Sequence, residues 1–482
     1  MQLNRAMFVR NFIATALSVL MSLSSSADWT YTEESTSGSS GTGYVSDGVW
    51  EFYAERKNGN ELLVKPKSPH NLFNGTGPTS INFSVVKSSD GTDCFVKTIR
   101  AISYGFDGCK KNLTEFIAPH CTSIEGEETF ADCEILTNVY LNESFNWATI
   151  PLKAFSGCKK LKLLHPLQFE NVTKVDKYAF SSCSDFTEKL DFPKCKEILD
   201  NAFDGSSIEE IDAPNLEVIG YMAFKGCKSL KKVSVGDKLI QIASGAFNGC
   251  TSLNPDFLND VIKKTLQYIG SKNLSSTYFG EEFKGCSTLT GPLIWDLPNL
   301  KTNIVGASCF RGCSSLEKVV FKTPVSEIRT EAFHGVKSGA EFYMHKKAPK
   351  VYATCAIGRS NSGTGTSYPK IYLQGSDEEI YKWLDVMGEN NFLILRKDFN
   401  NKDYSDSFIY KGATKTANWA NFASYMEFDE KVCAVEKSGS TITKLSVADK
   451  RVIGFLYYRS DTAYCHSWIL KVPQEGLKVI VR

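Results

Sequence analysis

The sequence predicts a solenoid of fold class α/β to β-rich, curved and right-handed, with a parallel sheet on its concave side. Three observations lead to this prediction. The chain has 482 residues, which is too long for one ordinary compact domain. Its middle half repeats a short motif ten times, and most copies are followed by an alternating apolar run typical of a strand. One copy alone cannot bury its apolar side chains, so we expect the copies to stack.

The repeated motif is Phe-x-Gly-Cys, often preceded by an apolar residue and an alanine. The steps between successive phenylalanines are 24, 25, 25, 23, 21, 23, 36, 27 and 23 residues. The ten phenylalanines are Phe106, Phe130, Phe155, Phe180, Phe203, Phe224, Phe247, Phe283, Phe310 and Phe333. Two inward-facing stretches per copy, joined by a turn that contains glycine, would make one coil. We therefore expect about ten coils over residues 99–340.

These copies resemble the BspA-type leucine-rich repeat, which is also described from treponemal surface proteins. The resemblance is carried by positions such as Ile219, Ala223, Phe224 and Cys227, which match the family pattern L-x-x-I-x-x-x-A-F-x-G-C. It implies a curved leucine-rich-repeat array whose parallel sheet lies on the concave side. It also implies a secreted or cell-surface protein that adheres to host proteins, matrix or other microbes.

The flanking regions differ from the array. Residues 1–27 are predicted to be a signal peptide, because a basic start precedes an apolar stretch too short to span a bilayer. Residues 28–98 are expected to form a linker, where Ser and Gly dominate, and then a small β-rich N-terminal cap. Residues 341–482 lose the repeat period and are predicted to form a C-terminal domain, α/β or β-rich. No second long apolar run follows, so we expect no integral membrane span after signal cleavage.

The long step after Phe247 predicts a helical insertion near residues 254–270. Asn254 and Pro255 are typical of a helix start. Apolar residues then recur at steps of four and three up to Gly270. The insertion is either a simple elaboration of the scaffold or a binding element, because loops on repeat scaffolds often carry binding.

The chain has 15 cysteines, and eight of them occupy the same position of the repeat. These eight are Cys109, Cys133, Cys158, Cys183, Cys227, Cys250, Cys286 and Cys313. A metal site needs converging ligands, whereas equivalent side chains of stacked coils point in parallel. We therefore predict buried free thiols that act as small apolar residues, and no metal site. A disulfide between Cys433 and Cys465 stays open.

Charge and motifs bear on the class of function. Lys and Arg number 55 and Asp and Glu number 54, so the balance argues against a nucleic-acid backbone or an acidic membrane surface as the main partner. The sequence lacks G-x-S-x-G, H-E-x-x-H and P-loop motifs, so we expect no catalysis and no cofactor. The alternative is an enzyme targeted by its repeats, with its chemistry in residues 341–482.

We expect a binding protein whose partner is an extracellular protein or a glycan. The contact would lie on the concave strands, whose exposed residues vary in charge and include few aromatics. The candidate binding residues are Tyr140, His165, Glu210, Asp212, Lys232 and Ser234. Such a surface suits a wide contact, and we expect no small cavity. A passive envelope or matrix component with no specific partner remains the other alternative, and the oligomeric state is not indicated.

Overall fold

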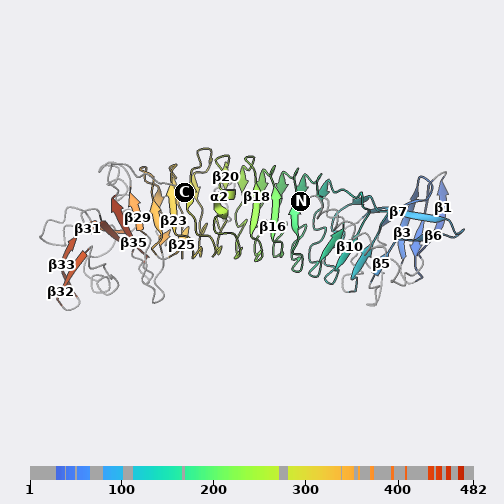
Figure 1. The fold of residues 1–482 in the computed structure, drawn as a ribbon, viewed down its shortest axis with the longest axis horizontal. Helices are drawn as coiled ribbons and strands as arrows, with labels where there is room; N and C mark the ends of the chain where they lie inside the picture. The colour runs from blue at the N-terminus through green and yellow to red at the C-terminus, as the bar shows by residue number, and fades with distance from the viewer. Residues whose placement is uncertain are drawn as a thin grey trace, which may run out of the picture. The chain divides into compact units, whose positions relative to one another are not determined.

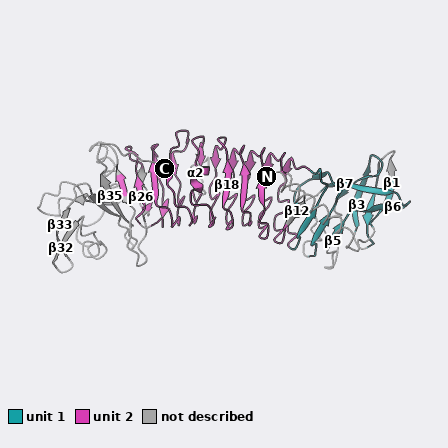
Figure 2. Cartoon of the chain, viewed as in Figure 1, with its two compact units in different colours: residues 1–129, 135–145, 163–166 teal, residues 130–134, 146–162, 167–482 magenta. Residues whose placement is uncertain are grey.

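The computed structural model describes the repeat array and most of the N-terminal region (Figure 1). The described residues are 29–37, 40–48, 51–65, 80–100, 112–165, 169–270, 280–337, 339–351, 356–358 and 370–373, and the strand segments 392–395, 408–409, 433–438, 441–447, 452–457 and 465–471. The signal-peptide prediction lies outside them. The chain divides into two compact units (Figure 2), the first made of residues 1–129, 135–145 and 163–166 and the second of 130–134, 146–162 and 167–482.

Unit 1 contains a closed β-sheet at its N-terminal end. The sheet runs in the order β4-β3-β2-β1-β6-β7-β9, and a pairing of β4 with β7 closes six of these strands into a barrel. The strands are β1 (Trp29–Ser37), β2 (Ser40–Ser46), β3 (Glu51–Lys57), β4 (Glu61–Lys65), β6 (Val86–Ser88), β7 (Asp93–Arg100) and β9 (Ser123–Glu125). Trp29, Phe52 and Phe83 form an aromatic cluster in unit 1 with centroid separations of 5.0–5.8 Å.

The prediction of a linker at the start of residues 28–98 is wrong. The segment rich in Ser and Gly forms the β1–β2 hairpin, and Tyr31 on β1 is buried. A Cβ atom on Gly43 would lie 2.0 Å from the carbonyl oxygen of Thr32. The glycine is therefore required by a close approach of two strands, not by flexibility.

The first coils of the array belong to unit 1, and a strand of the N-terminal region extends their sheet. Four parallel strands pair in the order β12-β10-β8-β5, so β5 begins this ladder. The strands are β5 (Ser80–Asn82), β8 (Glu115–Ile117), β10 (Asn138–Tyr140) and β12 (Leu163–His165).

Unit 2 is a stack of coils with two strand positions per coil, which confirms the predicted β-rich solenoid. We call the strands that follow the cysteine position the first ladder and those that precede the phenylalanine the second ladder. The first ladder comprises β14 (Lys189–Asp191), β16 (Glu210–Ala213), β18 (Lys232–Val235), β21 (Leu293–Trp295), β23 (Lys318–Phe321), β26 (Glu341–Tyr343) and β29 (Lys370–Leu373). The second comprises β11 (Thr149–Ile150), β13 (Lys174–Val175), β15 (Glu197–Ile198), β17 (Val218–Ile219), β19 (Gln241–Ile242), β20 (Tyr268–Ile269), β22 (Ile304–Val305), β24 (Glu327–Ile328) and β27 (Lys350–Val351). A short pair, β25 (Phe333–His334) with β28 (Ile357–Gly358), lies outside both ladders.

The repeat phenylalanines form a continuous column through the core of unit 2. From Phe130 to Phe333, successive rings lie 5.2–5.6 Å apart between centroids and within 15° of parallel. Each ring is fully buried. The backbone amide of each phenylalanine donates to the residue before the next one, as in Phe224 to Ala246 at 2.8 Å. The ring stack and this hydrogen bond together set the spacing between coils.

The repeat cysteines form a second column, and the prediction of buried free thiols is confirmed for the seven that the structure describes. Six of them donate from Sγ to the carbonyl oxygen of the phenylalanine in the preceding coil, at 2.9–3.1 Å. Each of these carbonyl oxygens also accepts from the backbone N–H three residues further along the chain, so the thiol adds a second hydrogen bond that links one coil to the next. Cys109 lies outside the described residues, as do the side chains of Cys433 and Cys465.

Labelling should separate free thiols from disulfides in this column. Burial raises the pKa of Cys227 and Cys313 to about 12, so thiolate is scarce at neutral pH. We expect iodoacetamide to leave the seven described repeat cysteines unmodified in the folded chain and to modify all of them in denaturant without reductant. Peptide mass spectrometry measures both states. Protection that persists in denaturant would show that these thiols are oxidised.

The insertion after Phe247 contains one short helix, α2 (Phe257–Val261), so the predicted helix over 254–270 is mostly wrong. Leu266 and Ile269 belong instead to the next coil, where β20 pairs in register with β19. Their spacing is the repeat's own L-x-x-I, which coincides with a helical period. Helix α2 takes the strand position of its coil and packs against β18 and β21 (Figure 1).

The array continues past residue 340. Strand β29 pairs in parallel with β26, and β35 (Cys465–Lys471) pairs in parallel with β29. The sheet then turns antiparallel through β34 (Val452–Tyr457), β30 (Phe392–Leu395) and β31 (Phe408–Ile409), and a separate hairpin joins β32 (Cys433–Ser438) to β33 (Thr441–Val447). Every helix or strand that the structure describes within residues 341–482 is a β-strand. Among the residues that the structure describes, we find no helix with the length and hydrophobicity of a membrane span.

Candidate interaction surfaces

Four of the six candidate residues come together on the first ladder. Strands β16 and β18 alternate, with Ile211, Ala213 and Val233 buried on the inward side and the outward positions half-exposed. The register places Glu210 beside Lys232 and Asp212 beside Ser234. Because adjacent strands lie about 4.8 Å apart, these side chains form one patch on the outer face of the sheet.

The patch alternates in charge across the strands. Lys189 Nζ lies 2.9 Å from Glu210 Oε2, and this ammonium lowers the pKa of Glu210. Asp191 on β14 stands beside Asp212 in the register, and within the described residues neither carboxylate has an ion-pair partner. A partner that brings a cation to Asp191 and Asp212 would relieve their mutual repulsion.

The other two candidates lie in unit 1, on β10 and β12, where Tyr140 pairs with His165 in the register. Tyr140 is 9% exposed, and burial raises its pKa. Its ring therefore offers little surface to a partner. The side chain of His165 is outside the described ones.

An aromatic pair that the sequence reasoning missed lies further along the first ladder. Tyr343 on β26 and Tyr372 on β29 are neighbours in the register and stack with centroids 4.4 Å apart and planes 6° from parallel. Both hydroxyls donate to the carboxylate of Glu341, at 3.1 and 3.3 Å. Lys318 Nζ lies 4.7 Å from the centre of the Tyr343 ring. Burial, and then the Glu341 carboxylate, raise the pKa of both tyrosines.

These four side chains form what we call the tyrosine cluster. Tyr343 and Tyr372 are half-exposed, while Phe342 and Ile371 between the outward positions are fully buried. In the sequence, both strands show the same run of a charged residue, an apolar residue and a tyrosine, at 341–343 and 370–372. It was overlooked because the strands lie 27 or more residues apart, beyond the last Phe-x-Gly copy.

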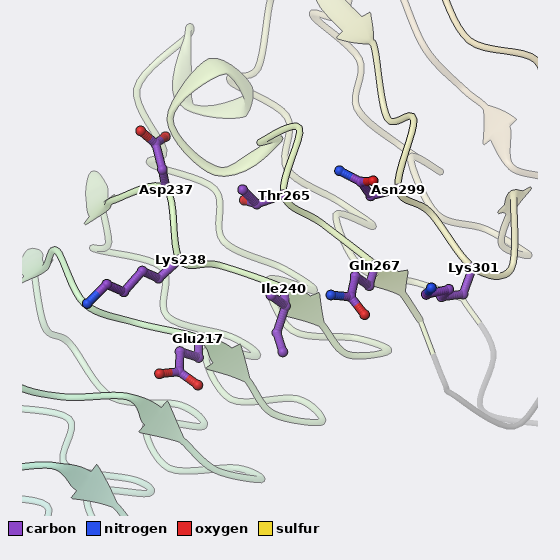
Figure 3. A pocket seen from close by; sticks show the side chains of 8 residues that line it. All are labelled: Glu217, Asp237, Lys238, Ile240, Thr265, Gln267, Asn299 and Lys301. Carbon is purple, nitrogen blue, oxygen red and sulfur yellow. The ribbon is translucent and has the colours of Figure 1, made fainter.

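A hollow of about 470 Å³ lies beside the second ladder, in contrast to the expectation of no small cavity (Figure 3). We call it the polar hollow. It is lined by Glu217, Asp237, Lys238, Ile240, Thr265, Gln267, Asn299 and Lys301. Two carboxylates, two ammonium groups, two amides and a hydroxyl surround a single aliphatic side chain, so polar side chains predominate in the lining.

One buried acid stands apart from these surfaces. Glu282 occupies the position that is alanine in most coils, directly before Phe283, and it is fully buried. Neither of its carboxyl oxygens has a hydrogen-bond partner of ordinary geometry among the described residues. Burial raises the pKa of Glu282 to about 7, and the neighbouring Cys309 thiol offsets part of that rise. The described residues contain no group of three or more His, Cys, Asp or Glu side chains that could hold a metal ion.

Comparison with known families gives a match over most of the array. The family described as "BspA type Leucine rich repeat region" matches residues 97–217 and 196–355 in six copies. Together these matches span more than half of the 482 residues. A comparison with curated proteins gave no match.

Three solved structures are similar at low identity. A leucine rich cell surface protein from Faecalibacterium prausnitzii is 17% identical, with 72% of this chain and 97% of that chain covered and a TM-score of 0.35. A leucine-rich repeat protein from Bacteroides ovatus is 19% identical, with coverages of 69% and 95% and a TM-score of 0.32. The pneumococcal vaccine antigen PcpA is 14% identical, with coverages of 72% and 96% and a TM-score of 0.28.

Proposed function

We propose that this chain, which belongs to the BspA-type leucine-rich repeat family, is a secreted or cell-surface protein that binds an extracellular partner through the outer face of its first ladder. Membership suggests a protein-interaction or adhesion role and a surface location. We also propose that the protein has no catalytic activity.

The tyrosine cluster is the observation that carries this proposal. Interfaces draw most of their binding energy from a few residues, among which Tyr and Arg are enriched. Tyr343 and Tyr372 are held in one orientation by their mutual stacking and by Glu341, so little side-chain entropy remains to be lost on binding. The charged patch at Glu210, Asp212 and Lys232 lies on the same ladder and would add orientation and a faster encounter.

A protein or glycan chain of extended shape fits such a face. Side chains on parallel strands form rows that run along the array, about 4.8 Å from one strand to the next. A partner lying along these rows contacts one residue per coil over a wide area, as is usual for repeat proteins.

Substitution of both tyrosines tests the proposal. We expect Tyr343→Ala with Tyr372→Ala to weaken partner binding at least tenfold, because a hot-spot residue contributes about 2 kcal/mol or more. The chain would first be screened against immobilised extracellular-matrix proteins and a glycan array, and the variants then measured by surface plasmon resonance against each binder found.

Tyr178→Ala is the matched control. Tyr178 is also exposed, at 39%, but lies in the turn between β13 and Phe180, away from the first ladder. It should leave affinity unchanged. Binding that survives the double substitution and also survives charge reversal of Glu210 and Lys232 would contradict the proposed face. Turnover of any offered substrate would contradict the proposed absence of catalysis.

A further inference from the structure

We propose that the polar hollow is a binding site for a neutral saccharide. This site is independent of the first ladder, since its lining residues lie in the segments that lead into the second-ladder strands. Figure 3 shows the eight lining side chains arranged around it, drawn from several successive coils.

The wall of the hollow is built on hydrogen-bonded backbone. Ile240 N donates to Glu217 O at 2.9 Å, Gln267 N to Ile240 O at 2.8 Å, and Lys301 N to Gln267 O at 2.8 Å. Glu217, Ile240 and Gln267 stand directly before their second-ladder strands in three consecutive coils, and Lys301 lies three residues before β22 in the next coil. A ligand would therefore meet side chains whose spacing is already fixed by the solenoid, which reduces the ordering cost of binding.

The hollow coincides with a break in the second ladder. The six-stranded sheet that holds β17 and β19 ends at β20, and the next strand, β22, belongs to another sheet. Gln267 and Lys301 lie on the two sides of this break. The lengthened coil that contains α2 contributes Thr265 and Gln267, so the insertion supplies part of the site as well as the helix.

Three of the lining side chains donate hydrogen bonds within the chain, and three others have no side-chain partner among the described residues. Lys238 donates to Asn215 at 2.8 Å, Thr265 to the carbonyl of Leu239 at 2.8 Å, and Asn299 to the carbonyl of Lys264 at 3.0 Å. The three without a side-chain partner in the described part of the chain are the carboxylate of Asp237, the amide of Gln267 and the ammonium group of Lys301. These groups could therefore bind a ligand.

A carboxylate acceptor, an amide that both donates and accepts, and an ammonium donor are what a polyhydroxylated ligand requires. Each sugar hydroxyl donates one hydrogen bond and accepts others. Ile240 gives the apolar surface on which the C–H groups of a sugar ring can rest. The volume of about 470 Å³ falls within the ordinary range for small-molecule sites.

The charge of the lining favours a neutral ligand. Glu217 and Asp237 balance Lys238 and Lys301, so the formal sum over the lining is zero. A phosphate or sulfate would gain from the two lysines but would be repelled by the two carboxylates of the same lining. A neutral saccharide uses both kinds of group without that conflict.

The test uses the full chain and neutral trisaccharides of glucose, galactose, mannose and N-acetylglucosamine, with sialylated and sulfated trisaccharides as charged probes. Binding would be followed by isothermal titration calorimetry and by saturation-transfer NMR. We expect at least one neutral trisaccharide to bind, and Asp237→Ala and Gln267→Ala each to weaken it roughly tenfold, the loss of about one charge-assisted or buried hydrogen bond. Thermal unfolding checks that each variant is folded.

Tyr178→Ala is the control, because Tyr178 lies outside both the polar hollow and the first ladder and should leave saccharide binding unchanged. The double variant Tyr343→Ala, Tyr372→Ala is measured beside it, so that a saccharide bound at the first ladder is distinguished from one bound in the hollow. The inference is overturned if no neutral trisaccharide binds, if only charged probes bind, or if Asp237→Ala combined with Gln267→Ala binds as the unchanged chain does.

Discussion

Replacing Glu282 with alanine is expected to stabilise the chain by about 3 kcal/mol more at pH 8 than at pH 4.5. The carboxyl is fully buried and without a hydrogen-bond partner among the described residues, so the folded state favours its neutral form. Its pKa is about 7 in the folded chain against 4.5 for an exposed glutamate. The unfolded chain therefore releases its proton first as the pH rises.

The sign of the pH effect follows from the order in which the unfolded and folded states lose this proton. Below about pH 4.5 both states hold the proton and the acid costs nothing electrostatically. Between about pH 4.5 and 7 the unfolded state gains stability by ionising, so the free energy of unfolding falls, and above about pH 7 the loss is complete. Alanine is the residue that Ala246 and Ala332 provide at the same position, and it cannot titrate.

Urea unfolding of both proteins at pH 4.5 and pH 8 measures this difference, and comparing the two pH values cancels any cavity that the substitution leaves. Glu282→Gln should lose the pH dependence in the same way. Glu281→Ala is the neighbouring control: Glu281 is partly exposed and paired with Lys284 at 2.7 Å, so less than about 1 kcal/mol is expected from it. An equal effect of Glu282→Ala at the two pH values would show that this carboxyl ionises normally in the folded chain.

Phe224→Ala is expected to lower the free energy of unfolding by about 3–5 kcal/mol, the usual cost of removing a buried aromatic ring. Its ring lies between those of Phe203 and Phe247, at 5.5 and 5.3 Å, and is fully buried. Neighbouring coils hold both rings in place by backbone hydrogen bonds, so the cavity cannot close by collapse. Chemical denaturation followed by circular dichroism measures the loss.

Lys225→Ala is the control for the ring substitution, because it changes the next residue of the same turn without touching the column. It should alter stability by less than about 0.5 kcal/mol. Phe224→Leu should fall between the two. If Phe224→Ala costs no more than Lys225→Ala, the column is not a main source of stability in unit 2.

The sequence predicted what repeats. The Phe and Cys columns could be placed because ten copies define the same positions, and burial at a repeated position has one simple explanation. The thiol donation from Cys158 or Cys250 to a phenylalanine carbonyl could not be predicted, since it depends on the distance between one coil and the next. A glycine in the sequence is compatible with a flexible linker or with two strands that approach closely. At Gly43 the structure shows two closely approaching strands.

The wrong helix prediction at the insertion and the tyrosine pair missed beyond residue 340 have related causes. Leu266 and Ile269 satisfy both a helical period and the repeat's own spacing, and the pairing of β20 with β19 selects the second. Tyr343 and Tyr372 lie on strands whose connecting segments lack the Phe-x-Gly-Cys motif. The repeat period therefore did not predict that the first ladder continues past residue 340. The polar hollow arises from residues of four coils, and no local pattern reports such an assembly.

The columns also have a genetic consequence. Each phenylalanine makes the same contacts, with the ring before it, the ring after it and the backbone just ahead of that ring. An in-frame deletion from Phe203 to Ala223 would join Ala202 to Phe224 and leave Phe180 the same acceptor and an equivalent ring to stack on. Unequal recombination between repeats can therefore shorten or lengthen the protein one whole coil at a time, and related chains of different length can share one core.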